Sequence, residues 1–131
     1  VGSVHAGFEV IDSRFTDFKF TLPDVVADNA SSSRLFIGAS GTDPAGLDLA
    51  LEAVVLSVNG TVVATATGAA VQGHPGEALA LAANALAERG EAIEAGAVVL
   101  TGGLTDAVFV RPSEQITAEF TNLGTLTVTG A

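Results

Sequence analysis

Residues 53–66 read AVVLSVNGTVVATA, and this stretch decides the fold class. Two runs rich in β-branched residues flank Asn59-Gly60. Both central positions of a type I′ turn need a positive φ, which Asn-Gly adopts at low cost. The stretch therefore predicts a β-hairpin between Glu52 and Gly68.

The segment after this hairpin predicts one Ala-rich helix over Pro75–Arg89. Pro75 suits the first helical position, and Gly90 suits the position just past the end. Apolar residues at positions 79, 82, 83 and 86 follow the i, i+3, i+4, i+7 spacing of a buried stripe. The alanines on this stripe would let the helix lie close to a sheet. His74 is expected to start the helix rather than to act as a base.

Short apolar runs on both sides of these elements predict further strands. A short helical turn and then a loop are expected over 24–33, a surface loop over 38–48, and a strand extension at 49–51. Turns are expected at 111–114 and 122–124. The fold class is thus mostly β (α+β). The predicted strands are 7–20 (with clear alternation from Asp17 to Thr21, ended by Pro23), 34–37, 97–101, 107–110, 115–120 and 125–128.

Composition excludes several classes of protein. The chain has 131 residues, 5 basic and 15 acidic, with a formal net charge of −10 and no cysteine. Thiol chemistry is therefore excluded, and so few cations disfavour both nucleic acid and an anionic membrane surface. The uncharged stretch between Glu52 and Glu77 contains turn signals, so no membrane span is expected. We expect a cytoplasmic domain whose start at Val1 reflects processing or a fragment.

Glu9 is the acidic residue with the most unusual surroundings. It lies among Phe8, Val10 and Ile11, where a carboxylate is costly unless it is paired or bound to a cation. Two interpretations stay open: an outward-facing strand residue, or a ligand of a hard metal such as Mg²⁺. One carboxylate cannot complete such a site, and no Glu-x-Glu pair lies nearby.

Other polar residues offer weaker signals. The run Asn29-Ala30-Ser31-Ser32 is typical of a loop, but it can also pool hydroxyl and N–H donors for an anion. The run 102–105 (GGLT) allows a close approach of backbone and ligand. Lys19 is expected to face solvent, and Arg14 to form a local ion pair with Asp12. No catalytic triad, phosphate loop or dinucleotide motif is present.

Four stretches taken together resemble one enzyme family. They are residues 8–14 (FEVIDSR), 21–32 (TLPDVVADNASS), 68–75 (GAAVQGHP) and 95–105 (AGAVVLTGGLT). The chain resembles the 2-hydroxypenta-2,4-dienoate (2-keto-4-pentenoate) hydratases, which are grouped with the 4-oxalocrotonate decarboxylases in the fumarylacetoacetate-hydrolase-like superfamily. The resemblance implies a mixed β-roll. It also implies that residues 1–131 are the C-terminal part of a single hydratase-like catalytic domain whose N-terminal half is absent.

The resemblance also implies a site. A Mg²⁺ or Mn²⁺ ion would take Glu9 as one ligand, and the family's Glu-x-Glu pair would lie upstream of this chain. Asn29 and Ser31 would hold substrate oxygens, and Gly103 and Thr105 would line the pocket. The family's upstream lysine and acid for proton transfer are missing, so the catalytic residues stay unassigned.

The implied activity is a metal-dependent hydratase (a lyase) of meta-cleavage catabolism of aromatic or steroid rings. It would add water to a 2-hydroxy-2,4-dienoate to give a 4-hydroxy-2-oxo acid. The alternatives are a 4-oxalocrotonate-type decarboxylase and a non-catalytic structural fragment. An acylpyruvate-type hydrolase is disfavoured because Asn29-Ala30-Ser31 stands where that group carries a lysine. Expected partners are the missing N-terminal half, further copies in a homo-oligomer and a 4-hydroxy-2-oxo acid aldolase.

Overall fold

A computed structural model describes all 131 residues and divides them into two compact units. The smaller unit is residues 7–37, and the larger unit is residues 1–6 with 38–131. The fold is mostly β with two antiparallel sheets and one main helix, so the predicted α+β class is confirmed. None of its helices combines the length and the apolar composition that crossing a bilayer requires.

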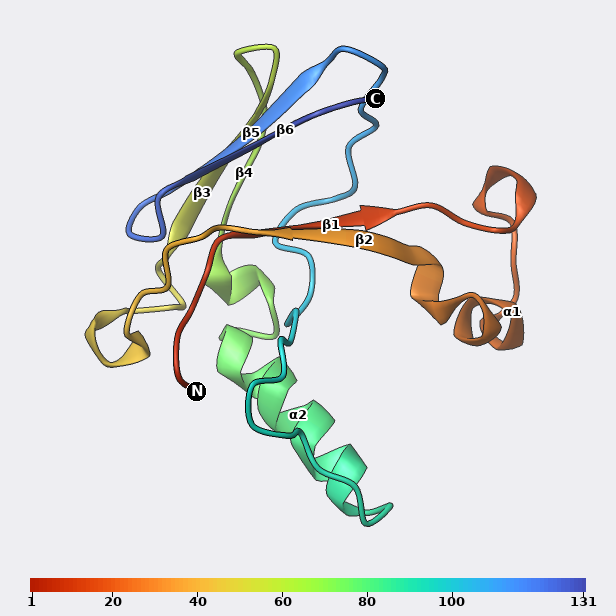
Figure 1. Ribbon diagram of the computed structural model, residues 1–131, viewed down its shortest axis with the longest axis vertical. Helices are drawn as coiled ribbons and strands as arrows, with labels where there is room; N and C mark the ends of the chain where they lie inside the picture. Colours follow the sequence, from red (N-terminus) through yellow and green to blue (C-terminus); the bar gives the residue numbers. More distant parts are fainter. The chain divides into compact units, whose positions relative to one another are not determined.

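The smaller unit is built on one antiparallel pair, β1 (Gly7–Ile11) and β2 (Ser32–Ile37). The predicted strand at 34–37 is confirmed and begins two residues earlier. Helix α1 (Leu22–Ala27) and two 3₁₀ turns, Thr16–Phe18 and Asn29–Ser31, make the connection between the strands. Figure 1 shows this connection gathered beyond one end of the strand pair.

The prediction of a strand that continues to Phe20 is wrong. The backbone turns at Thr16–Phe18, where Asp17 and Phe18 have φ values of 55° and 54°. These values lie in the left-handed region, which no strand contains. The rings of Phe15 and Phe20 instead meet edge to face with centroids 6.2 Å apart, so these aromatic side chains pack on each other across a turn.

Helix α1 begins where the sequence predicted the end of a strand. The backbone N–H and the hydroxyl of Thr21 both donate to the Asp24 carboxylate, at 2.9 and 2.7 Å. The pKa of Asp24 lies below its ordinary value because these backbone and side-chain hydrogen bonds outweigh its partial desolvation. Pro23 fits inside the first helical turn, since N–H groups there have no partner within the helix.

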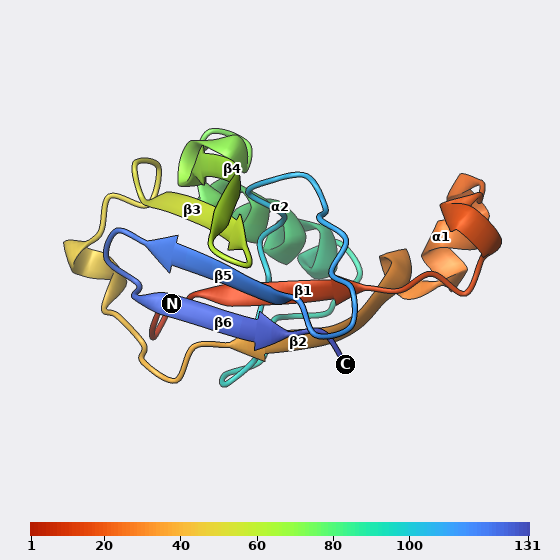
Figure 2. The ribbon, with the colours of Figure 1, turned by 90° about the horizontal axis from the view of Figure 1, so that it is seen from above.

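The larger unit contains a four-stranded antiparallel sheet with the order β4-β3-β5-β6 (Figure 2). Its strands are β3 (Ala53–Val58), β4 (Thr61–Thr67), β5 (Gln115–Phe120) and β6 (Thr125–Thr129). The predicted hairpin of β3 and β4 is confirmed, and so are the predicted strands at 115–120 and 125–128 with a turn between them. Asn59 and Gly60 have φ values of 49° and 80°, as a type I′ turn requires.

One face of this sheet forms the core of the larger unit. Val54 and Leu56 on β3 are buried, as are Ile116 and Ala118 on β5. Leu56 stands directly opposite Ala118 in the register of the two strands. These positions alternate along each strand, so they share one face of the sheet.

A buried carboxylate joins the two hairpins of this sheet. Glu52 is only 4% exposed. It accepts hydrogen bonds from the backbone N–H and side-chain amide of Asn122, at 2.7 and 2.8 Å, and from the N–H of Leu123 at 3.2 Å. The turn between β5 and β6 is therefore held against the start of β3.

The predicted helix is confirmed as α2 (Pro75–Ala87). The His74 ring caps it by accepting a hydrogen bond from the N–H of Gly76 at 2.9 Å, as its expected role at the helix start requires. The expected packing against a sheet is wrong. The helix has no fully buried residue, and Figure 1 shows it extending away from the four-stranded sheet.

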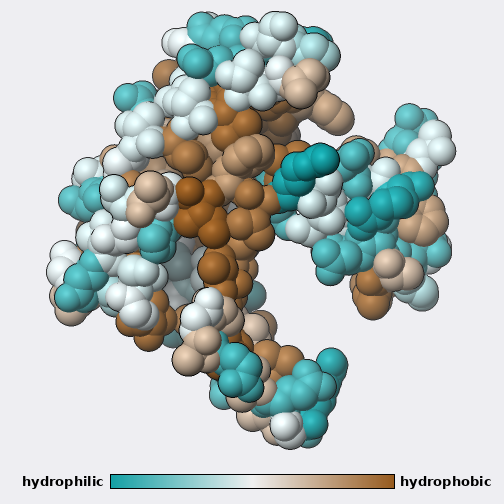
Figure 3. All heavy atoms as spheres, in the orientation of Figure 1, coloured by the Kyte–Doolittle hydropathy of each residue, from teal (hydrophilic) through white to brown (hydrophobic).

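The predicted strands at 97–101 and 107–110 are also wrong, since neither segment forms a strand or a helix. Val98, Leu100 and Phe109 are 63%, 41% and 85% exposed. Apolar residues favour a strand only where another strand offers hydrogen-bond partners, and none pairs with this segment. Figure 3 shows apolar side chains gathered in this region. Residues 49–51 likewise form a turn, in which the N–H of Leu51 donates to the carbonyl of Asp48.

Candidate functional site

Glu9 lies in the middle of β1 with its side chain exposed to solvent. It stands opposite Leu35 of β2, and its carboxylate has no hydrogen-bond or ion-pair partner within the chain. The geometry therefore matches the outward-facing interpretation, and it leaves both carboxylate oxygens free as hard donors for a cation. No three acidic or histidine side chains gather as a metal cluster anywhere in the chain. Glu9 alone therefore makes no metal site within this chain, although its free carboxylate has the chemistry of a single ligand for a divalent cation.

The polar run after α1 has an unusual backbone. Asn29, Ala30 and Ser31 have φ values of 52°, 53° and 60°, three consecutive non-glycine residues in the left-handed region. Each such residue costs about 1–2 kcal/mol. Strain of this kind persists only where the surrounding structure holds it, and it is concentrated at functional sites.

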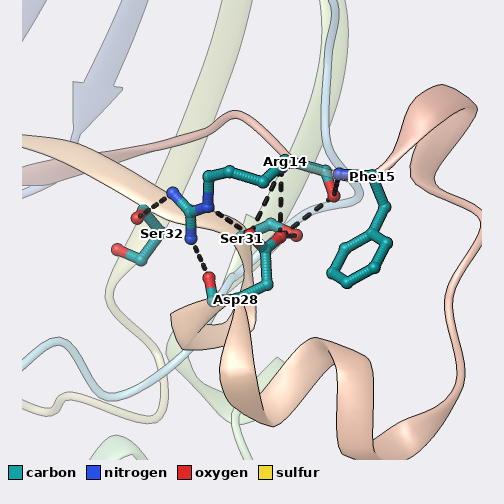
Figure 4. Close-up of polar contacts among 6 residues, drawn as sticks. Arg14, Phe15, Asp28, Ser31 and Ser32 are labelled. Atoms are coloured by element: carbon teal, nitrogen blue, oxygen red, sulfur yellow. Dashed lines mark hydrogen bonds and ion pairs between the residues drawn. The ribbon is translucent and has the colours of Figure 1, made fainter.

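Asp28 is the residue that holds this turn, and it is only 3% exposed. Its carboxylate accepts hydrogen bonds from the hydroxyls of Ser13 and Ser31, at 3.0 and 2.9 Å. It also accepts from the backbone N–H of Arg14 at 3.2 Å and from the Nε of the same residue. Figure 4 shows the guanidinium of Arg14 lying against Asp28 and Ser32.

Arg14 connects the two sides of the turn. Its Nη2 donates to the carbonyl of Asp28, and its Nη1 donates to the carbonyl of Ser32 at 3.5 Å. The predicted ion pair with Asp12 is wrong, because the partner is Asp28. The chain reverses between them, so a partner 14 residues away in sequence lies closer than the neighbouring acid.

The pKa of the Asp28 carboxyl reflects this environment. Burial raises it, but the hydrogen bonds from Ser31, Ser13 and Arg14 outweigh burial, so the pKa lies below its ordinary value of 3.8. Asp28 is therefore a carboxylate at neutral pH. No local sequence pattern marks Asp28, because its environment depends on burial and on donors from two separate segments.

The two candidate substrate-binding residues of this turn lie in different environments. Ser31 is buried. Its hydroxyl donates to Asp28, its N–H donates to the Asp28 carbonyl at 3.0 Å, and its carbonyl accepts from the N–H of Asp12 at 2.8 Å. Asn29 is exposed, and its side-chain amide makes no hydrogen bond within the chain. The amide of Asn29 is thus available to a ligand, whereas the hydroxyl proton of Ser31 is already committed.

The other candidate residues belong to the larger unit. Gly103 is exposed, and a Cβ added to it would lie 3.2 Å from the carbonyl oxygen of Thr105. Thr105 donates its hydroxyl to the carbonyl of Asp106 at 3.0 Å. Glu9, Asn29 and Ser31 all belong to the smaller unit, whereas Gly103 and Thr105 belong to the larger one.

Two remaining side chains have simple partners. Lys19 is exposed and pairs with Asp17 at 3.6 Å, as its predicted solvent-facing position implies. The His5 ring bonds to the Ser3 hydroxyl and the Gly38 carbonyl, at 2.8 and 2.9 Å.

The fold and these residues define a β-rich α+β protein that carries a free strand carboxylate and a strained polar turn. Residues 12–129 match the family described as fumarylacetoacetate (FAA) hydrolase C-terminal. The chain belongs to this family, as its sequence resemblance predicted.

Two curated relatives show which enzymes the chain is similar to within this family. The chain is 52% identical over 115 residues to a 4-oxalocrotonate decarboxylase of Pseudomonas sp. (strain CF600), an alignment that covers 88% of this chain and 44% of the relative. It is 42% identical over 121 residues to a 2-hydroxyhexa-2,4-dienoate hydratase of Comamonas testosteroni, covering 92% of this chain and 46% of that relative. The chain thus spans about half the length of the curated relatives it matches.

A solved structure agrees with the fold. The 4-oxalocrotonate decarboxylase from Pseudomonas putida G7, complexed with magnesium and adipate, superposes with a TM-score of 0.94 at 45% sequence identity. The superposition covers 99% of this chain and 49% of that protein. Residues 1–131 therefore have the fold of one half of such an enzyme.

Proposed function

We propose that this chain is part of a metal-dependent decarboxylase that acts on 4-oxalocrotonate in the meta-cleavage catabolism of aromatic compounds. The observation that carries the proposal is the order of identity, 52% to a decarboxylase and 42% to a hydratase. The family resemblance by itself predicts a hydratase first and a decarboxylase as the alternative. The relatives support the alternative better.

The proposed cofactor is Mg²⁺ or Mn²⁺, with Glu9 as one ligand. The relative from Pseudomonas putida G7 was complexed with magnesium, and the free carboxylate of Glu9 is the kind of donor that Mg²⁺ prefers. A divalent cation bound at such a site polarises the oxygen of a 2-oxo acid as a Lewis acid. The remaining ligands would come from a segment outside this chain.

The chain's own residues would bind and orient the substrate. We assign the exposed amide of Asn29 to a substrate oxygen, because it has no partner within the chain. Ser31 would accept from the 2-hydroxyl of the enol form of the substrate, since its own hydroxyl proton is donated to Asp28. Gly103 would let the substrate approach the backbone, and Thr105 would line the pocket. Adipate, bound by the relative, is a dicarboxylate like 4-oxalocrotonate, which favours a two-carboxylate substrate.

The second candidate is the hydratase, supported by 42% identity to the enzyme of Comamonas testosteroni. A hydratase would act on a 2-hydroxy-2,4-dienoate that has no second carboxylate to lose. Assembly into a homo-oligomer and work beside a 4-hydroxy-2-oxo acid aldolase belong to the same set of proposals.

One experiment separates these activities. A chimera with the N-terminal segment of the Pseudomonas sp. relative followed by residues 1–131 is supplied with Mg²⁺ and offered each substrate separately. Release of CO₂ from 4-oxalocrotonate supports the decarboxylase. Formation of a 4-hydroxy-2-oxo acid from 2-hydroxypenta-2,4-dienoate, without CO₂ release from the first substrate, supports the hydratase. Failure with both, together with no Mg²⁺ binding, leaves a non-catalytic fragment.

The metal assignment has its own test in the same chimera. Glu9→Gln keeps the size of the side chain and removes its charge. We expect it to weaken Mg²⁺ binding at least about tenfold by calorimetric titration, because a direct ligand is lost. Glu119→Gln on β5 is the matched control, since Glu119 is also an exposed strand carboxylate. Equal Mg²⁺ affinity in the two variants would refute the ligand assignment.

A further inference from the structure

The left-handed turn Asn29–Ser31 offers unused hydrogen-bond donors. The N–H groups of Asn29 and Ala30 have no acceptor within the chain, and both residues are exposed. Successive free N–H groups in this kind of backbone form a concave donor surface for anionic oxygens. The turn therefore presents backbone donors beside the free amide of Asn29.

Both ends of this turn are tied to the segment that continues β1. At its start, Asp28 holds Ser13 and Arg14 through its carboxylate. At its end, the carbonyl of Ser31 accepts from the N–H of Asp12. The guanidinium of Arg14 spans the turn from Asp28 to the carbonyl of Ser32.

These ties link the two halves of the candidate site within one compact unit. The segment from Asp12 to Arg14 directly follows the strand that carries Glu9, and the turn follows Asp28. A residue that bonds to both the Asp12–Arg14 segment and the turn fixes the position of the turn. It thereby sets where the donors of the turn lie relative to the Glu9 carboxylate. Asp28 makes more of these bonds than any other side chain of the unit.

We propose that Asp28 is a positioning residue, which holds the Asn29–Ser31 turn in its left-handed conformation so that the turn's donors meet the substrate. The inference rests on the proposed function for the identity of the substrate. Asp28 itself is buried and has its oxygens occupied by Ser13, Arg14 and Ser31, so it acts through the turn.

The central test compares Asp28→Asn with Asp24→Asn in the chimera. Both variants remove one charge from the same unit, but Asp24 bonds only to Thr21 at the start of α1. We expect Asp28→Asn to raise KM about 10- to 100-fold, because a misplaced binding group costs this much. Mg²⁺ affinity should stay unchanged. Asp24→Asn should leave KM within about twofold. A KM for Asp28→Asn equal to that of Asp24→Asn overturns the proposal.

A rescue variant distinguishes positioning from general damage. Glycine adopts a positive φ without strain, so Ala30→Gly lowers the cost of the left-handed turn. In the Asp28→Asn background, Ala30→Gly should lower the raised KM part of the way back to the value of the unmodified chimera. Should Asp28→Asn fail to fold, Arg14→Gln gives the same comparison, since it removes only the guanidinium bonds. No recovery with Ala30→Gly and no change with Arg14→Gln overturn the proposal.

Amide hydrogen exchange tests whether Asp28 holds the Asn29–Ser31 turn, a role called the clamp below, and it needs no measurement of enzyme activity. The N–H groups of Asp12 and Ser31 are bonded across the turn and should exchange at least about tenfold faster in Asp28→Asn than in Asp24→Asn. Equal exchange rates refute the clamp even in an active enzyme. An unmodified chimera that is inactive with both substrates refutes the proposed function instead, and the exchange result then decides the clamp alone.

Discussion

Gly68 provides the sharpest stability prediction, because its neighbour leaves no room for a side chain. It begins the 3₁₀ turn Gly68–Ala70 after β4. A Cβ built on Gly68 would lie 1.7 Å from the carbonyl oxygen of Leu49, whereas real Cβ contacts essentially never fall under 3.0 Å. Gly68→Ala therefore forces a displacement of at least 3.0 − 1.7 = 1.3 Å between two backbone segments.

The cost follows from the bonds that hold these segments together. The N–H of Gly68 donates to the carbonyl of Glu52, and the N–H of Ala69 donates to the carbonyl of Ala50, both at 2.9 Å. A displacement of this size breaks both bonds. Gly68 and Glu52 are buried, and each buried group left without a partner costs about 1–3 kcal/mol. Ala69 is exposed, so water replaces most of the second bond. We expect a loss of about 2–4 kcal/mol in the free energy of unfolding, which lowers Tm by about 8–15 °C.

Urea denaturation followed by circular dichroism measures this loss. Gly46→Ala is the matched control, because Gly46 also lies in a 3₁₀ turn and a Cβ there would meet nothing within 4 Å. That control should change stability by less than about 0.5 kcal/mol. A Gly68→Ala protein whose denaturation midpoint equals that of Gly46→Ala would refute the close approach of Leu49.

Three further substitutions or conditions test other parts of the structure. Ala30→Gly should stabilise the protein by about 0.5–1 kcal/mol in urea denaturation, because relief of left-handed strain exceeds the entropic cost of glycine; destabilisation would contradict the backbone of the turn. Glu52→Gln should cost about 2–3 kcal/mol, since a donor replaces an acceptor of three hydrogen bonds, whereas the exposed Glu119→Gln should cost less than about 0.5 kcal/mol. The folded pKa values of Asp24 and Asp28 lie below 3.8, so their stabilisation is present above that pH and is lost as the pH falls through the folded values. Denaturation midpoints should therefore fall on acidification below about pH 4, and less steeply in Asp24→Asn than in the unmodified protein.

The elements that were predicted correctly are those with local causes. The Asn59-Gly60 turn needs only its own backbone preference, and α2 needs only Pro75 at its start and Gly90 past its end. In both cases the residues that specify the conformation lie within a few positions of the residues that adopt it. The fold class followed from such local signals and from the family resemblance.

The incorrect strands share a different cause. Residues 97–101 and 107–110 are apolar enough for strands, but a strand also needs a neighbouring edge. The alternation from Asp17 to Thr21 failed because Phe15 and Phe20 pack on each other across a turn. A composition that permits a strand does not determine which segments lie beside it.

The residues of the candidate site also divide into those that local sequence patterns identify and one that depends on tertiary contacts. Glu9, Asn29 and Ser31 were identified from an acid in an apolar run, a run of small polar residues and a family resemblance. Their roles stay proposals. Asp28 was not identified, because its importance depends on burial and on donors from Ser13 and Arg14.

The amino-acid sequence by itself determined the hairpins, the main helix, the family and the residue types available for a metal and an anion. These depend on short-range backbone preferences and on patterns that a linear chain displays directly. Only the tertiary structure decided the partner of Arg14, the burial of Asp28 and the left-handed turn Asn29–Ser31. Each of these arises where segments distant in sequence meet, and the free energy of such contacts depends on distances that no local pattern records.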